Sequence, residues 1–340
     1  MTAVVGAVAV VAPMAAQAQP AVAQGTVVSA TPAAYTPNLD GGVIYSMAQV
    51  GSWLVAGGTF TSVTPHKGTT STAVTGIVAF DATTGAIDTG FMPSLNGEVD
   101  AVYPGPTANT VYVGGKFGTV NGTKSKGITL LDLSTGQVVA GFKPPALNGI
   151  VFGIRTVNDQ LLLTGTFTTA NSVAHSGLVS LNPTTGALTS YVNVQLTGHH
   201  NYNGTSGANG GVGGRALDVS PDGTRAVVVG DFKNADGVLH DQVVMLDLTS
   251  SGATVDTGWN TSAFTAPCAS GAFDSYVEDV DFAPDGSYFA IAATGGSTFS
   301  TNTDGTRSLC DSASRWATTD TGANVRPTWV DYTGNDTFWS

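Results

Sequence analysis

Short hydrophobic runs that end in glycine and are closely followed by phenylalanine recur along this chain. In residues 110–117 (TVYVGGKF), β-branched and aromatic residues come first and small or polar ones follow, a composition typical of pleated, half-buried strands. The repeats show no sustained helical periodicity, so strands are predicted throughout. Self-similarity at a period of tens of residues indicates a repeat fold. The related runs are residues 53–60 (WLVAGGTF), 161–167 (LLLTGTF), 226–232 (AVVVGDF) and, degraded, 289–296 (FAIAATGG).

The flanks of each run repeat as well. An apolar or aromatic residue stands thirteen positions before the glycine, as Tyr45 does before Gly58. A second apolar run with a tight turn follows the glycine, as in residues 78–85 (VAFDATTG), and a short segment then closes the unit on an aromatic residue. Four short strands in about 50 to 65 residues match one blade of a β-propeller. The closing aromatics are Phe91, Phe142, Tyr191, Trp259 and Trp329.

The repeats therefore predict an all-β fold, a β-propeller of four-stranded blades. Residues 26–37 are expected to supply a closing strand, because residues 35–41 (YTPNLDG) resemble the blade-ending residues 91–97 (FMPSLNG). Residues 336–340 resemble the opening of the first blade, which predicts a six- or seven-bladed ring truncated at its C-terminus. A natural five-bladed ring with a short tail is the alternative. The five visible blades are expected at residues 43–93, 99–144, 150–194, 215–259 and 277–330.

Composition and charge narrow the function classes. With 11% charged and 42% hydrophobic residues among 340, the chain is expected to be globular. Its net charge of −12 and pI of 4.5 argue against nucleic acid or an anionic membrane as a partner. The twelve basic residues show no cluster along the sequence.

The N-terminal stretch predicts export. Residues 1–24 are apolar and Ala-rich and contain Ala-x-Ala sites, which resembles a secretory signal peptide, assigned to residues 1–23. The apolar part is too short and too interrupted by proline for a membrane span. The absence of Lys and Arg before Lys67 departs from the usual signal and leaves the true start open. A secreted or cell-surface protein is expected.

The connections between strands carry the functional argument. With the strands labelled A to D from the axis outward, the A–B and C–D turns are short and rich in Asp, Asn, Pro and Gly, so Asp222 and Asp285 are expected to be turn residues. The B–C and D–A connections, which share the opposite face, vary in length. Binding residues on rigid scaffolds usually lie on such loops. The long connections are residues 62–74, 197–214, 261–276 and 297–315.

Two candidate features lie on that face. Cys268 in a D–A connection and Cys310 in the following B–C connection are expected to form a disulfide, contributing about 4 kcal/mol by the chain-entropy model. The stretch that contains His199, His200, Asn201 and Tyr202 could contact a sugar or help to hold a metal. Adjacent histidines in a strand point in opposite directions, so packing within the loop is the alternative.

Cofactor chemistry is weakly indicated. Glu278, Asp279 and Asp281, with Asp274 close by, offer oxygens to calcium but lack the DxDxDG order of a calcium loop. No GxSxG or HExxH motif occurs, and the glycine-rich insertion lacks the GxxxxGK[ST] of a phosphate loop. No cofactor, metal site or catalytic residue is predicted.

The repeats resemble those of bacterial exported β-propellers of the delta-60 type. The resemblance is carried by VYVGGKFGTVNG followed by GITLLDLSTG, and by VVVGDFKNADG followed by VVMLDLTSSG, and it extends over residues 35–340. It is specific for the fold and uninformative for activity, and it implies surface or polysaccharide-binding modules further along a longer chain.

A second resemblance keeps an enzyme open. Residues 79–85 (AFDATTG) copy the first half of the AxDxxTGxxxW repeat of quinoprotein dehydrogenases, but Thr89 stands where the tryptophan is expected. The sequence thus favours a binding or scaffold propeller for glycans or cell-surface ligands, acting through the long B–C and D–A loops. The alternative is a propeller enzyme, either a quinoprotein-like oxidoreductase or a carbohydrate-active hydrolase or lyase.

Overall fold

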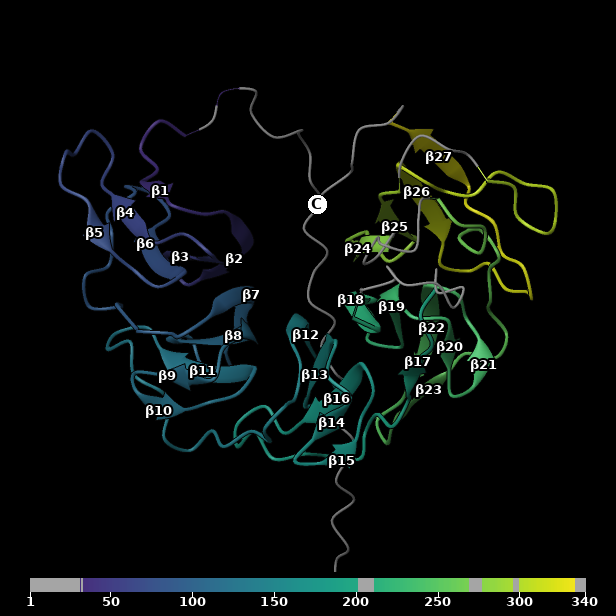
Figure 1. Cartoon of the computed structure of the whole chain (residues 1–340), viewed down its shortest axis with the longest axis horizontal. Coiled ribbons are helices and arrows are strands. Elements are labelled where there is room, and N and C mark those ends of the chain that lie inside the picture. Colours follow the sequence, from purple (N-terminus) through teal and green to yellow (C-terminus); the bar gives the residue numbers. More distant parts are fainter. Residues whose placement is uncertain (1–30, 32, 201–210, 269–276, 296–299, 334–340) are drawn as a thin grey trace, which may run out of the picture.

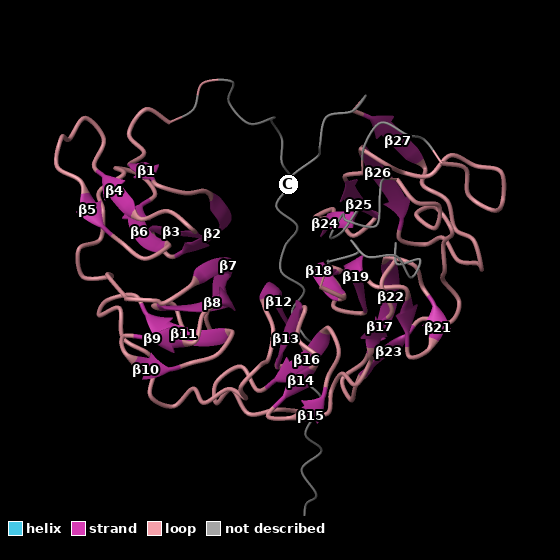
Figure 2. Cartoon of the chain, in the orientation of Figure 1, coloured by secondary structure: helices cyan, strands magenta, loops and turns pink. Residues whose placement is uncertain are grey.

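The computed structural model describes Thr31 and residues 33–200, 211–268, 277–295 and 300–333 (Figure 1). Within these residues the regular elements are strands, as predicted (Figure 2). Five antiparallel sheets stand around a common axis, so the protein is a β-propeller. The described part of the chain has no helix with the length and hydrophobicity needed to cross a membrane. The expected export signal at residues 1–23 and the blade start at 336–340 lie outside the described residues.

Each sheet runs in chain order from the axis outward (Figure 1). In the first three blades the outermost strand is reduced to a single bridge, from Phe80 to Ile87, Leu131 to Val138 and Leu181 to Leu188. The strands are β2 (Ile44–Val50), β3 (Trp53–Gly58) and β6 (Ile77–Asp81) in blade one; β7 (Glu98–Pro104), β8 (Thr110–Lys116) and β11 (Ile128–Asp132) in blade two; β12 (Val151–Val157), β13 (Gln160–Gly165) and β16 (Leu178–Leu181) in blade three; β18 (Gly213–Val219), β19 (Arg225–Asp231), β22 (Val243–Leu248) and β23 (Ala253–Val255) in blade four; and β24 (Val277–Phe282), β25 (Tyr288–Ala293), β26 (Ser312–Ala317) and β27 (Trp329–Tyr332) in blade five.

The inner strand of every blade carries a β-bulge at the same place. In blades one and three the signature glycine of the neighbouring strand leaves room for it, because a Cβ on Gly58 would clash with the carbonyl oxygen of Val43, and one on Gly165 with that of Ile150. Blade five has Ala293 at this position. A bulge re-aims the side chain that it displaces. The bulged residues are Tyr45, Asp100, Phe152, Arg215 and Glu278.

The thirteen-residue spacing found in the sequence does not mark the same structural position in every blade. Tyr45 and Phe152 are bulged residues, whereas Val102 and Leu217 at the same spacing are buried in the core. The reason is the A–B turn, which is longer in blades two and four than in blades one and three.

The hydrophobic core lies between neighbouring blades. Phe142, which closes blade two, packs against Tyr112 with ring centroids 5.7 Å apart, in a cluster that includes residues of blade three. Trp259, which closes blade four, contacts Trp316 of blade five at 6.0 Å. The closing aromatics are therefore buried wherever a following blade covers them, whereas Trp329 is 51% exposed.

Small hairpins in the B–C connections were not predicted. They lie at the outer edge of the ring (Figure 1), and each pairs with the segment that leads into its own blade. The described part of the expected closing strand, residues 33–37, is turn and coil. The hairpins are β4 (Ser62–Thr64) with β5 (Thr72–Ala73), β9 (Thr119–Val120) with β10 (Thr123–Lys124), β14 (Thr169–Ala170) with β15 (Val173–Ala174), and β20 (Asn234–Ala235) with β21 (Val238–Leu239); their partners are β1 (Asn38–Asp40), Leu95, Leu147 and β17 (Leu196–Thr197).

In three of these hairpins, a single turn residue holds the segment that leads into the blade. Asn121 has a φ of 49° and its Oδ1 accepts the backbone N–H of Ser94 at 2.8 Å. Its own N–H donates to the Ser94 carbonyl at 2.7 Å. Asn171 and Asp236 repeat the conformation and the hydrogen bonds. The Asn-Gly, Asn-Ser and Asp-Gly pairs of the sequence are thus hairpin turns that join each blade to its linker.

Replacing Asn121 separates two contributions to stability. Asn121→Ala removes the acceptor and places an ordinary side chain at positive φ, so we expect the free energy of unfolding to fall by about 2 kcal/mol. Asn121→Gly removes the acceptor but tolerates the backbone, so we expect a loss of about 1 kcal/mol. Urea unfolding of both variants measures the difference, and an unchanged midpoint for Asn121→Ala would contradict this role.

Candidate functional site

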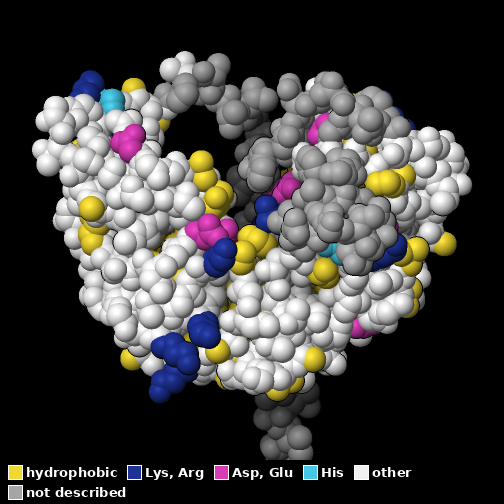
Figure 3. Space-filling model, viewed as in Figure 1, with side chains coloured by type: hydrophobic (Ala, Val, Ile, Leu, Met, Phe, Trp, Pro, Cys, Tyr) yellow, Lys and Arg dark blue, Asp and Glu magenta, His cyan; other side chains and the backbone are white. Residues whose placement is uncertain are grey.

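The bulged residues form a first ring of side chains at the axial opening. Arg215 of β18 is central, because its Nε donates to Glu278 Oε2 of β24 at 2.9 Å and its guanidinium lies 4.4 Å from the Phe152 ring centroid of β12. Three blades thus meet at one guanidinium. Figure 3 shows acidic and basic side chains gathered around the hollow centre of this face.

A second ring lies three residues further along the same strands. Arg155 of β12 pairs with two acids there, with Nε 2.7 Å from Asp218 Oδ1 and Nη2 3.7 Å from Asp281 Oδ1. Its guanidinium lies 5.8 Å from the Tyr103 ring centroid, and Asp218 Oδ2 also accepts the backbone N–H of Phe282. Partly buried ion pairs cost desolvation, so they specify geometry more than they add stability.

Asp100 is the acid of the first ring that blade two contributes. Burial, with the nearby charge of Glu98, raises the pKa of Asp100 to about 7, and the charges of Arg215 and Lys116 oppose the rise. Its Oδ2 is buried without a hydrogen-bond partner in the described structure. The axial opening therefore holds a carboxyl group that titrates near neutral pH.

The two predicted histidines lie at the root of the insertion of blade four, next to the first ring. His199 Nε2 is 2.9 Å from Asp231 Oδ2, and His200 Nδ1 is 2.7 Å from Asp241 Oδ1. The His200 backbone N–H also donates to Asp231 Oδ1 at 3.1 Å. All four side chains are less than 10% exposed.

These pairs fasten the described start of the insertion, residues 199 and 200, to the blade. Asp231 ends β19 and also lines a small depression shared with Phe152, Thr166 and Arg215, so the histidines adjoin the axial ring. Asn201 and Tyr202 lie outside the described residues, so ligand contact by this stretch stays a prediction. Asp231 and Asp241 were missed, and the only signal for Asp231 was an aspartate where blades one and three have threonine.

The acidic stretch suggested for calcium is divided between the two rings. Glu278 pairs with Arg215 and Asp281 with Arg155, while Asp274 lies outside the described residues. Within the described ranges, no group of three or more His, Cys, Asp or Glu side chains is arranged to hold a metal ion.

The C–D turns explain the resemblance to quinoprotein repeats. Asp81 Oδ1 accepts the backbone N–H groups of Thr83 and Thr84 and the Thr84 hydroxyl, and these hydrogen bonds lower the pKa of Asp81. Asp132 and Asn182 make the same turn in blades two and three. The DxxTG pattern therefore builds a turn in this protein.

The predicted disulfide is confirmed. Cys268 and Cys310 are bonded, with their Cα atoms 5.5 Å apart, and join the D–A connection before blade five to the B–C connection within it. Gly295 packs on the bond, where a Cβ would lie 2.5 Å from the Cys268 Cβ.

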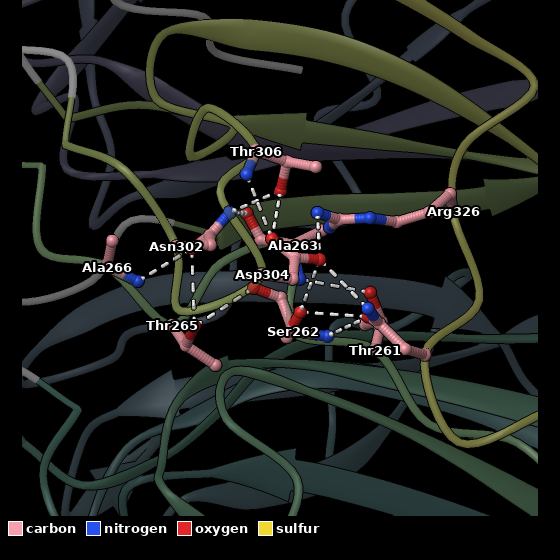
Figure 4. Close-up of polar contacts among 10 residues, drawn as sticks. Thr261, Ser262, Ala263, Thr265, Ala266, Asn302, Asp304, Thr306 and Arg326 are labelled. Atoms are coloured by element: carbon pink, nitrogen blue, oxygen red, sulfur yellow. Dashed lines mark hydrogen bonds and ion pairs between the residues drawn. The ribbon is translucent and has the colours of Figure 1, made fainter.

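A polar network beside the disulfide ties the same loops together (Figure 4). Asp304 Oδ2 accepts from Arg326 Nη2 at 2.6 Å and from Asn324 Nδ2 at 2.9 Å, while its Oδ1 accepts from Thr306. Asn302, 3% exposed, accepts the backbone N–H of Ala266 at 2.9 Å. Three connections of blade five are thereby held as one unit.

Removing the disulfide should cost measurable stability. The bond closes a separation of 42 residues, so the double variant Cys268→Ser, Cys310→Ser is expected to lose about 4 kcal/mol of unfolding free energy by the chain-entropy model. Urea unfolding should give the same midpoint for this variant and for the reduced wild-type protein. A wild-type midpoint that does not move on reduction would contradict the expectation.

Asp100 should make stability depend on pH. The unfolded chain releases the proton near pH 3.9 and the folded protein near pH 7, so the free energy of unfolding falls as pH rises through this window. Asp100→Asn removes the dependence and should stabilise the protein by about 2 kcal/mol at pH 8, with the gain disappearing towards pH 4.

The control is Asp159→Asn, in the exposed A–B turn of blade three. Denaturant unfolding of both variants between pH 4 and pH 8 tests the expectation. If the free energy of unfolding of Asp100→Asn changes with pH in the same way as that of the wild-type protein, the expectation is wrong.

Comparison with known proteins supports the fold. A family model described as the Rax2 C-terminal beta propeller domain matches residues 77–210, less than half of the chain. No curated protein sequence matched.

Three similar solved structures have low sequence identity to this chain, and one of them is described as a beta-propeller domain. The RRP9 WD40 repeats are 11% identical, with a TM-score of 0.49, and 88% of this chain and 68% of that one are covered. The beta-propeller domain of Myceliophteria thermophila Cps50 (Swd1) is 10% identical, with a TM-score of 0.48 and coverage of 86% and 74%. Kuenenia stuttgartiensis hydrazine synthase is 15% identical, with a TM-score of 0.46 and coverage of 86% and 67%. The five sheets and the family match identify this chain as a β-propeller.

Proposed function

We propose that this protein is an exported β-propeller that binds a glycan or another cell-surface ligand at the axial opening. The disulfide between Cys268 and Cys310 supports export, because such bonds persist in oxidising compartments. The proposal agrees with the general use of rigid propeller scaffolds as binding or scaffold modules.

The observation that carries the proposal is the first axial ring. Arg215 offers the N–H donors of its guanidinium group, and Glu278 and Asp100 offer carboxylate acceptors. Phe152 offers an aromatic ring in the same region. A few directed polar groups beside an apolar surface are what small-ligand sites require, and sugars offer hydroxyl groups and an apolar ring face to such a set. His199, paired with Asp231, lies directly beside it.

A glycan array tests the ligand class, and two matched double variants test the site. Arg215→Gln, Glu278→Gln replaces the axial ion pair by a neutral pair and should weaken glycan binding about tenfold or more. Arg225→Gln, Asp256→Asn changes another inter-strand ion pair of blade four, 3.8 Å apart, and should leave binding unchanged.

The readout is the dissociation constant from isothermal titration with the best glycan of the array. Unchanged binding by the axial variant would exclude the axial site. A wild-type protein that binds no glycan of the array, with or without calcium, would exclude the glycan ligand.

A further inference from the structure

A second recess lies at the outer edge of blade two, far from the axial ring. It has a volume of about 570 Å³ and lies between β10, the outer segment at residues 137–140 and the linker at 142–146. Asn121 closes one end, because its Nδ2 donates to the Gly136 carbonyl at 2.9 Å. The volume is in the range of ligand-binding clefts.

The recess is basic in an acidic protein. Lys124, Lys126 and Lys143 line it and are exposed, so three of the six lysines of the chain meet here although the sequence showed no basic cluster. None of the described residues that line it is acidic. Lys and Arg side chains gather at the outer edge of the ring in Figure 3, in the region where Figure 1 draws β9 and β10. With a net charge of −12 on the whole chain, this local reversal favours an anionic ligand.

The backbone of β10 is open towards the recess. β10 pairs with β9 alone, in a hairpin closed by a two-residue turn. Because hydrogen-bonded and non-hydrogen-bonded pairs alternate in antiparallel sheets, the pair of Lys124 with Thr119 is non-hydrogen-bonded, and the N–H and C=O of Lys124 point away from β9.

The opposite wall has a second open edge. The Gln137 carbonyl and the Val139 N–H bond to β11, so the N–H and C=O of Val138 between them point outward. Val138 also lines the recess. Two open strand edges therefore border one basic groove.

Blade four shows how this protein closes such an edge. There the Asn260 Nδ2 donates at 2.9 Å to the carbonyl of Leu239, the residue of β21 equivalent to Lys124. Lys143 takes the place of Asn260 in blade two, one residue after the closing aromatic, and no described group bonds to the Lys124 carbonyl.

We propose that this groove binds an extended acidic polypeptide segment, which adds as a strand to β10. Open edges supply main-chain hydrogen bonds, and the lysines on β10, just after it and on the linker select acidic side chains and disfavour neutral strands. A sugar is the weaker match, because Phe142, the one aromatic residue lining the groove, is only 3% exposed. The groove is independent of the axial site.

Fluorescence anisotropy with a labelled octapeptide, Glu-Val-Glu-Thr-Glu-Val-Glu-Thr, tests the proposal. The triple variant Lys124→Glu, Lys126→Glu, Lys143→Glu should weaken binding about tenfold or more. Its matched control, Lys67→Glu, Lys116→Glu, Lys233→Glu, makes the same charge change with the three remaining lysines and should retain most of the affinity. Equal losses in the two variants would overturn the site.

Two further probes distinguish strand addition from charge attraction. The same peptide N-methylated at alternate residues keeps its charge but loses main-chain donors, so it should bind about tenfold more weakly. Lys143→Asn, which copies Asn260 of blade four, should also weaken binding. Undiminished binding of the methylated peptide, or tighter lysine-dependent binding of a sulfated oligosaccharide than of the octapeptide, would overturn the proposal of a peptide strand.

Discussion

The architecture depends on a close backbone approach at the start of each inner strand. In blades one and three the signature glycine, Gly58 or Gly165, leaves room for a carbonyl of the strand next to it, and that strand bulges two residues after this carbonyl. The bulge turns a side chain towards the axis. The bulge recurs in each blade, and close backbone contacts explain why four of the five blades carry a glycine where a strand would otherwise favour a larger residue. Blade five has Ala293 at this position and bulges as well.

The two arginines of the inner strands organise the axis. Arg215 pairs with Glu278 of blade five, and Arg155 pairs with Asp218 of blade four and Asp281 of blade five, one arginine in each ring. Because partly buried charges are costly unless paired, a guanidinium paired with carboxylates of other blades specifies how the blades meet. The outer edge is arranged differently: hairpins reach out from the blades, and Lys124 and Lys143 reverse the charge of the surface. The ring therefore presents two chemically distinct surfaces, an axial one with mixed charge and a peripheral one that is basic.

The parts of this structure that are repeated and local were predictable. The strand runs predicted the fold class, and two cysteines in neighbouring connections predicted their bond. The small hairpins in the B–C connections were missed because their strands are only two or three residues long, below the length at which periodicity is visible. The axial ring was missed because A–B turns differ in length, so a fixed count from the glycine selected Tyr45 in one blade and the core residue Val102 in the next.

The sequence by itself determined the blades, the turn chemistry at residues such as Asp81, and the only possible intramolecular disulfide, because these follow from local backbone preferences and from having just two cysteines. The tertiary structure decided which side chains meet. His199 finds Asp231, and Lys124 joins Lys143 in one groove, through strand pairing and the bulge rather than through any spacing along the chain. Contacts across a ring depend on register and twist, which accumulate from all blades together, and no single segment encodes them.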